Sequence, residues 1–570
     1  MSLPWVVRQG AIANVEEEMG QESMDSAPDF DAVIIGAGYS GMRMLVELRR
    51  LGMTARIFET GAEVGGTWYW NRYPGARTDS EAWVYCYDFD DDLLDEWDWA
   101  ERYPTQAQSL AYLTHVADRF DLRRDITFNT TVTGARWSDE TAAWVVETSD
   151  GASTTARFLV SAMGQQCVVV DPPFPGATTF QGESYNSNRW PDRNTDFAGK
   201  RVAIVGAGAT AIQMIPIVAE EAAELVVFQR TPNYVLPARN YVTTEEQRNS
   251  IKRQYRAVWD HAYNHPFGQY FPPANRVSAD VPDPEERRRI FEYGWERGGF
   301  RFLFETFDDL TTNQACNDEA SEFVRDRIRA IVHDPETAER LCPKDYPLGG
   351  KRPPAGHFYY ETFNLPHVKL VSLPETPIAE VTPTGIRMED GTLHEVDVII
   401  WALGFDAVTG ALIRLGVEGR DGVTIGEAWD SDKPAQHFGL TTPGFPNMFA
   451  LAGPQGAFGN FQSFMTKQVE WVGSVMAHMA DSGDAAVEVT RECAYDWAEA
   501  CEEAIDATVL MGGVAGHSWF LGANVEGKKA RVMFYFGGVN TYNKMLAEST
   551  ENGFPGYEFR AARATATVEA

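Results

Sequence analysis

The sequence predicts an α/β protein with two parallel-sheet domains and a mainly helical insertion. Two stretches far apart in the chain, DAVIIGAGYSG from Asp31 and RVAIVGAGATA from Arg201, lead to this prediction. Each runs from β-branched residues through closely spaced glycines into a helix-compatible segment, the order of a strand, a tight turn and a helix. Between residues 239 and 341, apolar residues recur at helical spacing in Arg- and Glu-rich stretches.

The remaining patterns divide the chain. Alternating ITFNTTVTGARW and AAWVVETSD predict an antiparallel hairpin that leads into the strand ARFLVSAMG of the first domain, and FQSFMTKQVEWVGSVMAHMAD predicts a long helix. We expect a flexible N-terminal arm at residues 1–28, because this stretch is acidic and then small and polar. The predicted domains are a first nucleotide-binding domain at 29–165 and 396–570, a second at 166–238 and 342–395, and the helical insertion at 239–341.

Composition excludes several classes of protein. With 44% hydrophobic residues over 570 positions, the chain can bury more than one core. Its formal charge of -33 repels phosphate polymers and anionic lipid surfaces, so we expect no nucleic acid or membrane partner. The six cysteines show no metal-like or CxxC spacing, which predicts reduced thiols, no metal site and a cytoplasmic location. Nothing in the sequence predicts the oligomeric state.

The first glycine motif has the features of a dinucleotide site. Gly36 permits the tight turn, Gly38 lets the backbone approach a pyrophosphate, and Gly41 allows the helix to pack closely on the strand. Glu59 stands 23 residues after Gly36, at the end of the next predicted strand. A carboxylate there accepts hydrogen bonds from ribose hydroxyls.

The second motif carries Gly206, Gly208 and, at the third position, Ala211. The residue 23 positions after Gly206 is Gln229, so a neutral amide replaces the acid, and Arg230 and Thr231 follow it. A guanidinium suits a ribose 2′-phosphate, which favours NADPH over NADH. The alternative is that Arg230 is an ordinary surface ion-pair residue.

An aromatic stretch, GGTWYWNRYPGARTD, spans Gly65 to Asp79. Two nucleotide sites in one chain imply a resident cofactor and a visiting hydride donor, and the ribose chemistry favours FAD in the first motif and NADPH in the second. We expect the rings of Trp68, Tyr69, Trp70 and Tyr73 to line the flat flavin ring. The alternative is a hydrophobic loop anchored in the core.

These motifs together resemble the type I Baeyer-Villiger monooxygenases, a group of class B flavoprotein monooxygenases. The stretch from Gly65 to Asp79 satisfies every fixed position of one family fingerprint, and FQGESYNSNRWP aligns with the other, FxGxxxHxxxWP, except that Asn186 takes the place of the histidine. The resemblance extends from about Asp31 to near Asn540 through VFQRTPNYVLPARN, GGKRPPAGHFYYETFN and SWFLGANVEGK.

The resemblance implies an FAD-containing enzyme that uses NADPH and dioxygen to convert a small-molecule ketone into an ester or lactone through a flavin peroxide. Arg352 matches the family's catalytic arginine, Asp79 the carboxylate that orients it, Lys351 a residue facing the nicotinamide nucleotide phosphate, and Trp519 a residue that closes over NADP. The other positions expected to bind the cofactors are Gly66, Thr67, Trp68, Tyr85 and Thr210. Residues 453–465, rich in phenylalanine, match the substrate cavity and suggest an apolar, cyclic or bulky ketone.

Two alternatives stay open. Asn186 cannot titrate near neutrality, so any proton or charge role of the family's histidine is absent, and a non-oxygenating NADPH oxidase or redox-sensing flavoprotein is one alternative. A flavin monooxygenase that oxygenates nitrogen or sulfur is the other, although Trp190, Pro191 and the motif ending at Asp79 argue against it. A disulfide reductase would need a paired redox cysteine near the first motif, and the sequence has none there.

Overall fold

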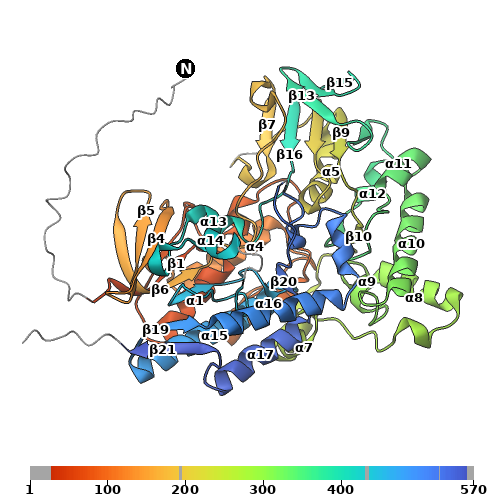
Figure 1. Ribbon diagram of the computed structural model, residues 1–570. Helices are drawn as coiled ribbons and strands as arrows, with labels where there is room; N and C mark the ends of the chain where they lie inside the picture. Colours follow the sequence, from red (N-terminus) through yellow and green to blue (C-terminus); the bar gives the residue numbers. More distant parts are fainter. Residues whose placement is uncertain (1–26, 192–194, 431–434, 526, 562–570) are drawn as a thin grey trace, which may run out of the picture.

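The computed structural model describes residues 27–191, 195–430, 435–525 and 527–561. Two sheets organise these residues, each with a glycine motif directly after one of its strands, β1 or β8, and most helices lie around them (Figure 1). Except for its last two residues, the arm predicted at 1–28 lies outside the described residues. Over the described ranges, no helix combines the length and apolar character needed to cross a membrane.

The first sheet has the strand order β3-β2-β1-β6-β5-β4, with β17 beside the end of β6. Its central strands run parallel, and they are buried because helices or other strands cover both faces. The predicted hairpin is confirmed, because β4 and β5 pair antiparallel and β5 then pairs with β6. The strands are β1 (Phe30–Ile35), β2 (Ala55–Phe58), β3 (Ile126–Thr127), β4 (Val132–Ser138), β5 (Ala143–Thr148), β6 (Ser153–Ser161) and β17 (Met448–Ala450).

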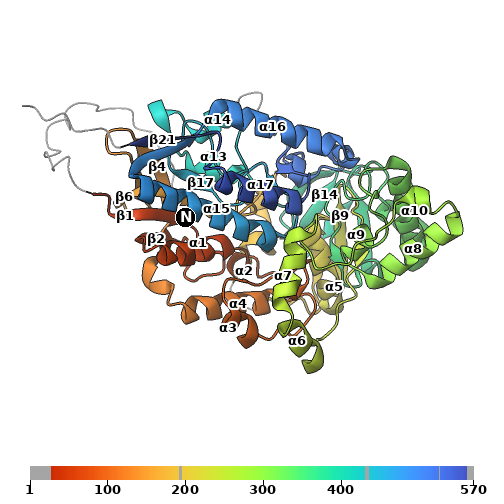
Figure 2. The same cartoon turned by 90° about the horizontal axis from the view of Figure 1, so that it is seen from below.

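Helices from both ends of the chain complete this first part. The predicted long helix is α15, which packs against α1 and α17 (Figure 2). Gly473 permits the contact with α1, since a Cβ there would lie 2.9 Å from Cγ of Glu47. These helices are α1 (Tyr39–Arg50), α2 (Thr67–Trp70), α3 (Asp91–Glu96), α4 (Gln106–Arg119), α13 (Gly410–Leu415), α14 (Ile425–Asp430), α15 (Phe461–Ser482), α16 (Arg491–Asp506) and α17 (Val539–Glu551).

The second sheet has the order β12-β9-β8-β16-β7, and every pair in it is parallel. The strands are β7 (Glu183–Asn186), β8 (Arg201–Val205), β9 (Glu224–Gln229), β12 (Val368–Ser372) and β16 (Val398–Trp401), and α5 (Ala209–Glu221) follows β8. The boundary predicted at residue 396 assigns β16 to the first domain, but β16 hydrogen-bonds between β8 and β7. The boundary is therefore wrong by at least the length of that strand, because its pairing partners are distant in sequence.

Short strands occupy the connections. A three-stranded antiparallel sheet precedes β16, and paired short strands join distant segments elsewhere. These strands are β10 (Leu236–Pro237) with β11 (Ala355–Gly356), β13 (Ile378–Thr382) with β14 (Gly385–Met388) and β15 (Leu393–Glu395), β18 (Gly456–Ala457) with β20 (Phe534–Tyr535), and β19 (Asp484–Val489) with β21 (Tyr557–Ala561).

The predicted helical insertion is confirmed. Helices α8, α10 and α11 lie at the outer side of the second sheet, away from β1 and β4 (Figure 1). The helices of this region are α6 (Glu245–Lys252), α7 (Tyr255–Asn264), α8 (Pro284–Arg297), α9 (Arg301–Phe304), α10 (Gln314–Ile331) and α11 (Pro335–Leu341), and α12 (Tyr359–Thr362) follows.

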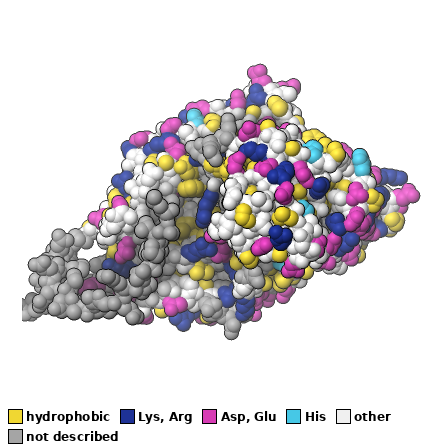
Figure 3. All heavy atoms as spheres, turned by 90° about the horizontal axis from the view of Figure 1, so that it is seen from above, with side chains coloured by type: hydrophobic (Ala, Val, Ile, Leu, Met, Phe, Trp, Pro, Cys, Tyr) yellow, Lys and Arg dark blue, Asp and Glu magenta, His cyan; other side chains and the backbone are white. Residues whose placement is uncertain are grey.

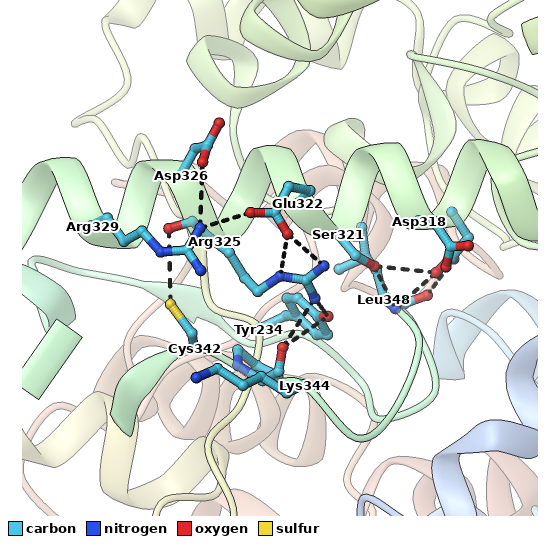
Figure 4. Close-up of polar contacts among 12 residues, drawn as sticks. Tyr234, Asp318, Ser321, Glu322, Arg325, Asp326, Arg329, Cys342, Lys344 and Leu348 are labelled. Carbon is cyan, nitrogen blue, oxygen red and sulfur yellow. Dashed lines mark hydrogen bonds and ion pairs between the residues drawn. The ribbon is translucent and has the colours of Figure 1, made fainter. Parts of the chain in front are cut away.

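Helix α10 holds the segment that leads into Lys351 and Arg352. Arg325 donates to the hydroxyl of Tyr234 at 2.9 Å and to the carbonyl of Pro343 at 3.1 Å, and Glu322 pairs with Arg325 (Figure 4). The backbone nitrogen of Leu348 donates to the side chain of Asn317 at 3.0 Å. These bonds fix residues 343–348 against the insertion, and thereby the start of the turn that follows.

Buried charges tie the first part of the chain to the insertion. The carboxylate of Glu81 is fully buried and accepts from Arg102 at 2.7 Å and from Arg301 at 2.8 Å. Arg301 also pairs with Glu305. Because both guanidiniums are almost fully buried, their charges depend on these carboxylates for compensation.

We expect Glu81→Gln to lower the free energy of unfolding by about 3 kcal/mol, since it leaves two buried guanidiniums short of a counter-charge. Thermal unfolding followed by circular dichroism measures the change as a lower Tm. Glu285→Gln is the matched control, because its ion pair with Arg289 is mostly exposed and such pairs contribute less than about 1 kcal/mol. Equal Tm values for the two variants would contradict this assignment.

Candidate active site

A cavity of about 1290 Å³ lies between the two glycine motifs. It exceeds the range of roughly 300–1,000 Å³ typical of sites for one drug-sized ligand. Figure 3 shows one face of the protein that is hollowed between its two larger parts, with hydrophobic, lysine and arginine side chains gathered in the hollow. The cavity has two arms: the first arm runs beside Gly36 and Gly38 of the first motif, and the second arm runs beside Gly206 and Gly208 of the second motif.

The first arm is shaped by backbone that tolerates no side chains. Gly36 has φ +103°, and a Cβ on Gly41 would lie 1.9 Å from the carbonyl oxygen of Gly36, so helix α1 starts directly against the turn. Gly66, at φ +51°, packs directly against Gly38, since a Cβ on Gly66 would lie 2.8 Å from the Cα of Gly38. A flat or phosphate-bearing ligand can therefore approach bare backbone here.

Glu59 lies at the carboxyl end of β2 and lines this arm. Its buried carboxylate accepts from the backbone nitrogens of Ala37 at 2.7 Å and Gly61 at 2.6 Å. These bonds orient the carboxylate beside the turn, and each carboxylate oxygen retains acceptor capacity for a ribose hydroxyl.

The aromatic stretch divides between the cavity and the core. Trp68, Trp70, Tyr73 and Tyr85 line the cavity, and the rings of Trp68 and Tyr85 meet edge to face with centroids 5.8 Å apart. The prediction for Tyr69 is wrong. Its ring packs against Gly61 and under the guanidinium of Arg72, 4.4 Å from the ring centre, because a short helix, α2, turns successive side chains to different sides.

The second arm repeats the geometry of the first. Gly206 has φ +131°, and a Cβ there would lie 2.2 Å from the carbonyl oxygen of Ala402. Gly208 and Thr210 line the cavity, whereas Ala211 is fully buried where α5 packs on the sheet. Gln229, at the position that carries Glu59 in the first arm, is buried and donates to the carbonyl of Arg340 at 2.7 Å. Position 229 therefore places no carboxylate in the second arm.

Basic side chains gather at the far end of the second arm. Arg230, Thr231 and Lys351 line the cavity, and so does Trp519. Burial, and then the charge of Arg230, lowers the pKa of Lys351 to about 8. Two neighbouring cationic side chains in a partly desolvated site form a receptor for an anion.

Asp79 and Arg352 meet where the arms join. Nη1 of Arg352 lies 2.9 Å from Oδ2 of Asp79, and the backbone nitrogen of Ala355 donates to Oδ1 at 3.3 Å. Only 3% of the Asp79 side chain is exposed, against 31% of Arg352. Burial raises the pKa of Asp79, and the guanidinium of Arg352 opposes that rise. The pair thus directs one face of the guanidinium toward the cavity.

The structure brings most of the predicted site residues to this one cavity. Gly41 and Ala211 do not line it, in agreement with their expected packing role. The predicted residues that line it are Gly36, Gly38, Glu59, Gly66, Thr67, Trp68, Asp79, Tyr85, Gly206, Gly208, Thr210, Arg230, Thr231, Lys351, Arg352 and Trp519.

Among the cavity-lining residues that sequence reasoning missed are Gln213, Phe267, Phe300 and His517. Gln213 accepts from the hydroxyl of Tyr73 at 2.9 Å and so joins the aromatic stretch to α5. The two phenylalanines come from the insertion, where the aromatic break NHPFGQYF between helical patterns was the available signal for Phe267. No pattern in the sequence pointed to His517.

Asn186, at the fingerprint histidine position, does not line the cavity. Its side-chain oxygen accepts from the backbone nitrogen of Asn188 at 3.1 Å and caps the short turn after β7. Asn188 does line the cavity. The amide at position 186 therefore shapes a cavity wall through its neighbour.

Comparison with known proteins places the chain among flavin enzymes. The family model described as pyridine nucleotide-disulphide oxidoreductase matches residues 33–253. The chain is 41% identical to a phenazine N-monooxygenase of Lysobacter antibioticus (93% of this chain, 96% of the relative) and 40% identical to a Baeyer-Villiger monooxygenase of Pseudooceanicola batsensis (92% and 95%). It superposes with a TM-score of 0.90 on the crystal structure of cyclohexanone monooxygenase from Rhodococcus sp. Phi1 bound to NADP+, at 40% identity, covering 94% of this chain and 99% of that one.

We expect Gly66→Ala to reduce the flavin retained by the purified protein to less than about a tenth of the parent ratio. The new Cβ would clash with the Cα of Gly38 at 2.8 Å and disturb the first arm. In addition, the positive φ at this position costs a residue with a side chain about 1–2 kcal/mol of conformational energy. The absorbance ratio of flavin to protein measures the loss. Gly134→Ala is the control, because its Cβ would meet only the Glu147 carboxylate at 3.5 Å. Full flavin content in Gly66→Ala would overturn the assignment of this arm.

Proposed function

We propose that this chain, which belongs to the Baeyer-Villiger monooxygenase family of flavoproteins, holds FAD in its first arm and NADPH in its second and oxygenates a ketone beside Arg352. It is an NADPH-dependent monooxygenase that acts on small molecules and dioxygen and converts a ketone into an ester or lactone. The observation that carries the residue assignment is the buried contact of Asp79 with Arg352 where the two arms join.

The two arms fit the two cofactors by their donor chemistry. In the first arm, Glu59 offers a carboxylate to ribose hydroxyls, and the backbone of Gly38 and Gly66, which pack against each other without side chains, lets a flat ring approach closely. In the second, Arg230, Thr231 and Lys351 suit a 2′-phosphate, which a carboxylate at position 229 would repel. These contacts support FAD in the first arm and NADPH in the second.

Arg352 supplies the fixed positive charge that the reaction needs. Reduced FAD, when bound, supplies the electrons that activate dioxygen. Attack on a ketone then places negative charge on oxygen, and a preorganised cation in a water-poor site stabilises that charge strongly. Arginine suits this role because its side chain does not lose its proton in proteins. Asp79 holds the guanidinium in place, and the burial of Asp79 limits exchange of this contact with water.

A second, apolar cavity of about 590 Å³ opens beside Arg352 and is proposed to receive the substrate. Arg352 lines both cavities, so a ketone oxygen at their junction can reach the guanidinium. Phe267 stacks on Phe304 with centroids 4.8 Å apart. The aromatic side chains that line the second cavity are Phe267, Phe300, Phe304, Phe458, Tyr535 and Phe536. The volume and these walls favour a bulky apolar ketone over a small polar one.

A second candidate activity is oxygenation of an aromatic nitrogen. The similarity to a phenazine N-monooxygenase and the aromatic walls of the second cavity support it. Incubation with NADPH, dioxygen and both substrate classes separates the two, because a ketone gives an ester or lactone and a nitrogen heteroaromatic gives an N-oxide.

The cellular setting follows from charge and thiols. All six cysteines are described, and none is in a disulfide. These thiols fit a reducing compartment, so we propose a cytoplasmic location. The net charge of -33 supports the absence of a nucleic acid partner.

Replacing Arg352 with alanine tests the role of the charge. We expect Arg352→Ala to lower the rate of ester formation by at least about a hundredfold, the loss typical of a removed oxyanion stabiliser, while NADPH is still oxidised and hydrogen peroxide is released. Gas chromatography measures the ester, and a peroxidase assay measures the peroxide. Arg289→Ala, a change at an exposed ion pair, is the control. Ester formation at the parent rate in Arg352→Ala would refute the assignment.

Narrowing the second cavity tests the substrate class. Ala504 on α16 lines this cavity, and we expect Ala504→Leu to raise KM for polycyclic ketones about tenfold or more, while KM for a small cyclic ketone stays unchanged. Glu499→Leu, on an exposed face of the same helix, is the control. Steady-state kinetics with both ketones give the answer, and equal effects on the two would show that the cavity does not receive the substrate.

A further inference from the structure

His517 reaches the basic end of the second arm from a segment that is remote in sequence. It lies between the short helical turns η7 (Leu510–Val514) and η8 (Trp519–Leu521). Its Nδ1 is 3.3 Å from the hydroxyl oxygen of Thr231. His517 lines the cavity together with Arg230, Thr231 and Lys351. Groups from three segments, around residues 230, 351 and 517, therefore converge on one end of the arm.

Close backbone packing holds this segment in place. A Cβ on Gly513 would lie 1.9 Å from the carbonyl oxygen of Gly350, so the two backbones touch. A Cβ on Gly516 would lie 2.8 Å from the ring of Tyr346 and 3.0 Å from Cδ of Lys351. Two glycines thus seat the segment directly on the turn that carries Lys351 and Arg352, and His517 follows at once.

The charges around His517 favour an anion. Burial, and then Arg230 and Lys351, lowers the pKa of His517, and the same two influences of burial and Arg230 lower the pKa of Lys351. Tyr346, whose pKa burial raises, lies under Lys351 as a neutral ring. Among the described residues that line the cavity, the carboxylates are Glu59 and Asp79, which belong to the first arm and to Arg352. A phosphate would relieve the repulsion among these cationic groups.

We propose that His517 binds the 2′-phosphate of NADPH together with Arg230, Thr231 and Lys351, so that recognition of the phosphate and seating of the segment that carries Trp519 are one event. This inference rests on the proposed binding of NADPH in the second arm. This role makes His517 a specificity-determining residue, because NADH lacks the 2′-phosphate and its affinity is therefore not increased by His517.

The test measures binding without turnover. The FAD-loaded enzyme is titrated in a calorimeter with adenosine 2′,5′-bisphosphate and, separately, with 5′-AMP. We expect His517→Ala to weaken the bisphosphate about tenfold or more, the loss of one hydrogen bond to a charged group, and to leave 5′-AMP unchanged. His517→Arg should restore bisphosphate binding. His333→Ala, at an exposed histidine, should match the parent.

A pH series adds a second readout. An anion bound beside His517 favours its protonated form, so parent affinity for the bisphosphate should fall from pH 6 to pH 8 more steeply than that of His517→Arg. The phosphate itself titrates near pH 6, and Lys351, whose pKa burial and Arg230 lower to about 8, begins to lose its proton toward pH 8. The arginine variant, whose charge at position 517 is constant, reports these two contributions without that of His517. Parallel slopes in the two proteins would contradict the role of His517.

The outcomes distinguish failure of the proposed NADPH site from failure of the role given to His517. If the parent enzyme binds the bisphosphate no more tightly than 5′-AMP, the proposed NADPH site itself fails. If the parent prefers the bisphosphate and His517→Ala keeps that preference in full, only the inference on His517 fails. Unchanged 5′-AMP binding and flavin content in each variant show that it is folded.

Discussion

The contact between Asp79 and Arg352 is the constraint around which the site is arranged. Asp79 ends the aromatic stretch of the first part of the chain, and Arg352 belongs to the turn held by the insertion. Taking a carboxylate out of water is costly, and burial raises the pKa of Asp79 for this reason, so the paired guanidinium offsets the cost of keeping it ionised. One contact therefore joins two parts of the chain and orients a cation where two cavities meet.

The aromatic stretch can deliver Asp79 only because it is seated on α5. A Cβ on Gly75 would lie 2.3 Å from the carbonyl oxygen of Gln213, so the turn after Tyr73 rests on helix backbone. The hydroxyl of Tyr73 bonds to the side chain of Gln213, and burial raises the pKa of Tyr73 to about 12, which keeps this hydroxyl a donor at physiological pH. The aromatic stretch, which begins in the first arm, is thereby held against helix α5 beside the second arm. Its last residue, Asp79, consequently lies next to Arg352.

Local geometry was predictable from the sequence, and packing between distant segments was not. The strand-turn-helix units, the hairpin of β4 and β5 and the helical insertion all depend on neighbours in the chain, so spacing and glycine chemistry indicated them. The placement of β16 and the orientation of Tyr69 depend on partners far away in sequence or on the exact turn of a short helix, and both predictions were wrong. Phe267 and His517 enter the site through such distant contacts as well.

The same distinction separates the chemistry of the site from its specificity. The two arms are made of bare glycine backbone and one short turn, where almost any added atom collides, so their form tolerates little change. The second cavity is instead walled by side chains from the insertion, from α16 and from residues 535–538. Phe267 and Phe300 of the insertion line both cavities, whereas the walls from α16 and residues 535–538 do not line the first cavity and can change volume without altering it. Among the described residues, Arg352 is the charged side chain that lines both cavities. A change of substrate therefore requires new walls, whereas the position of the cation, set by Asp79 and by the bonds of α10, can stay as it is.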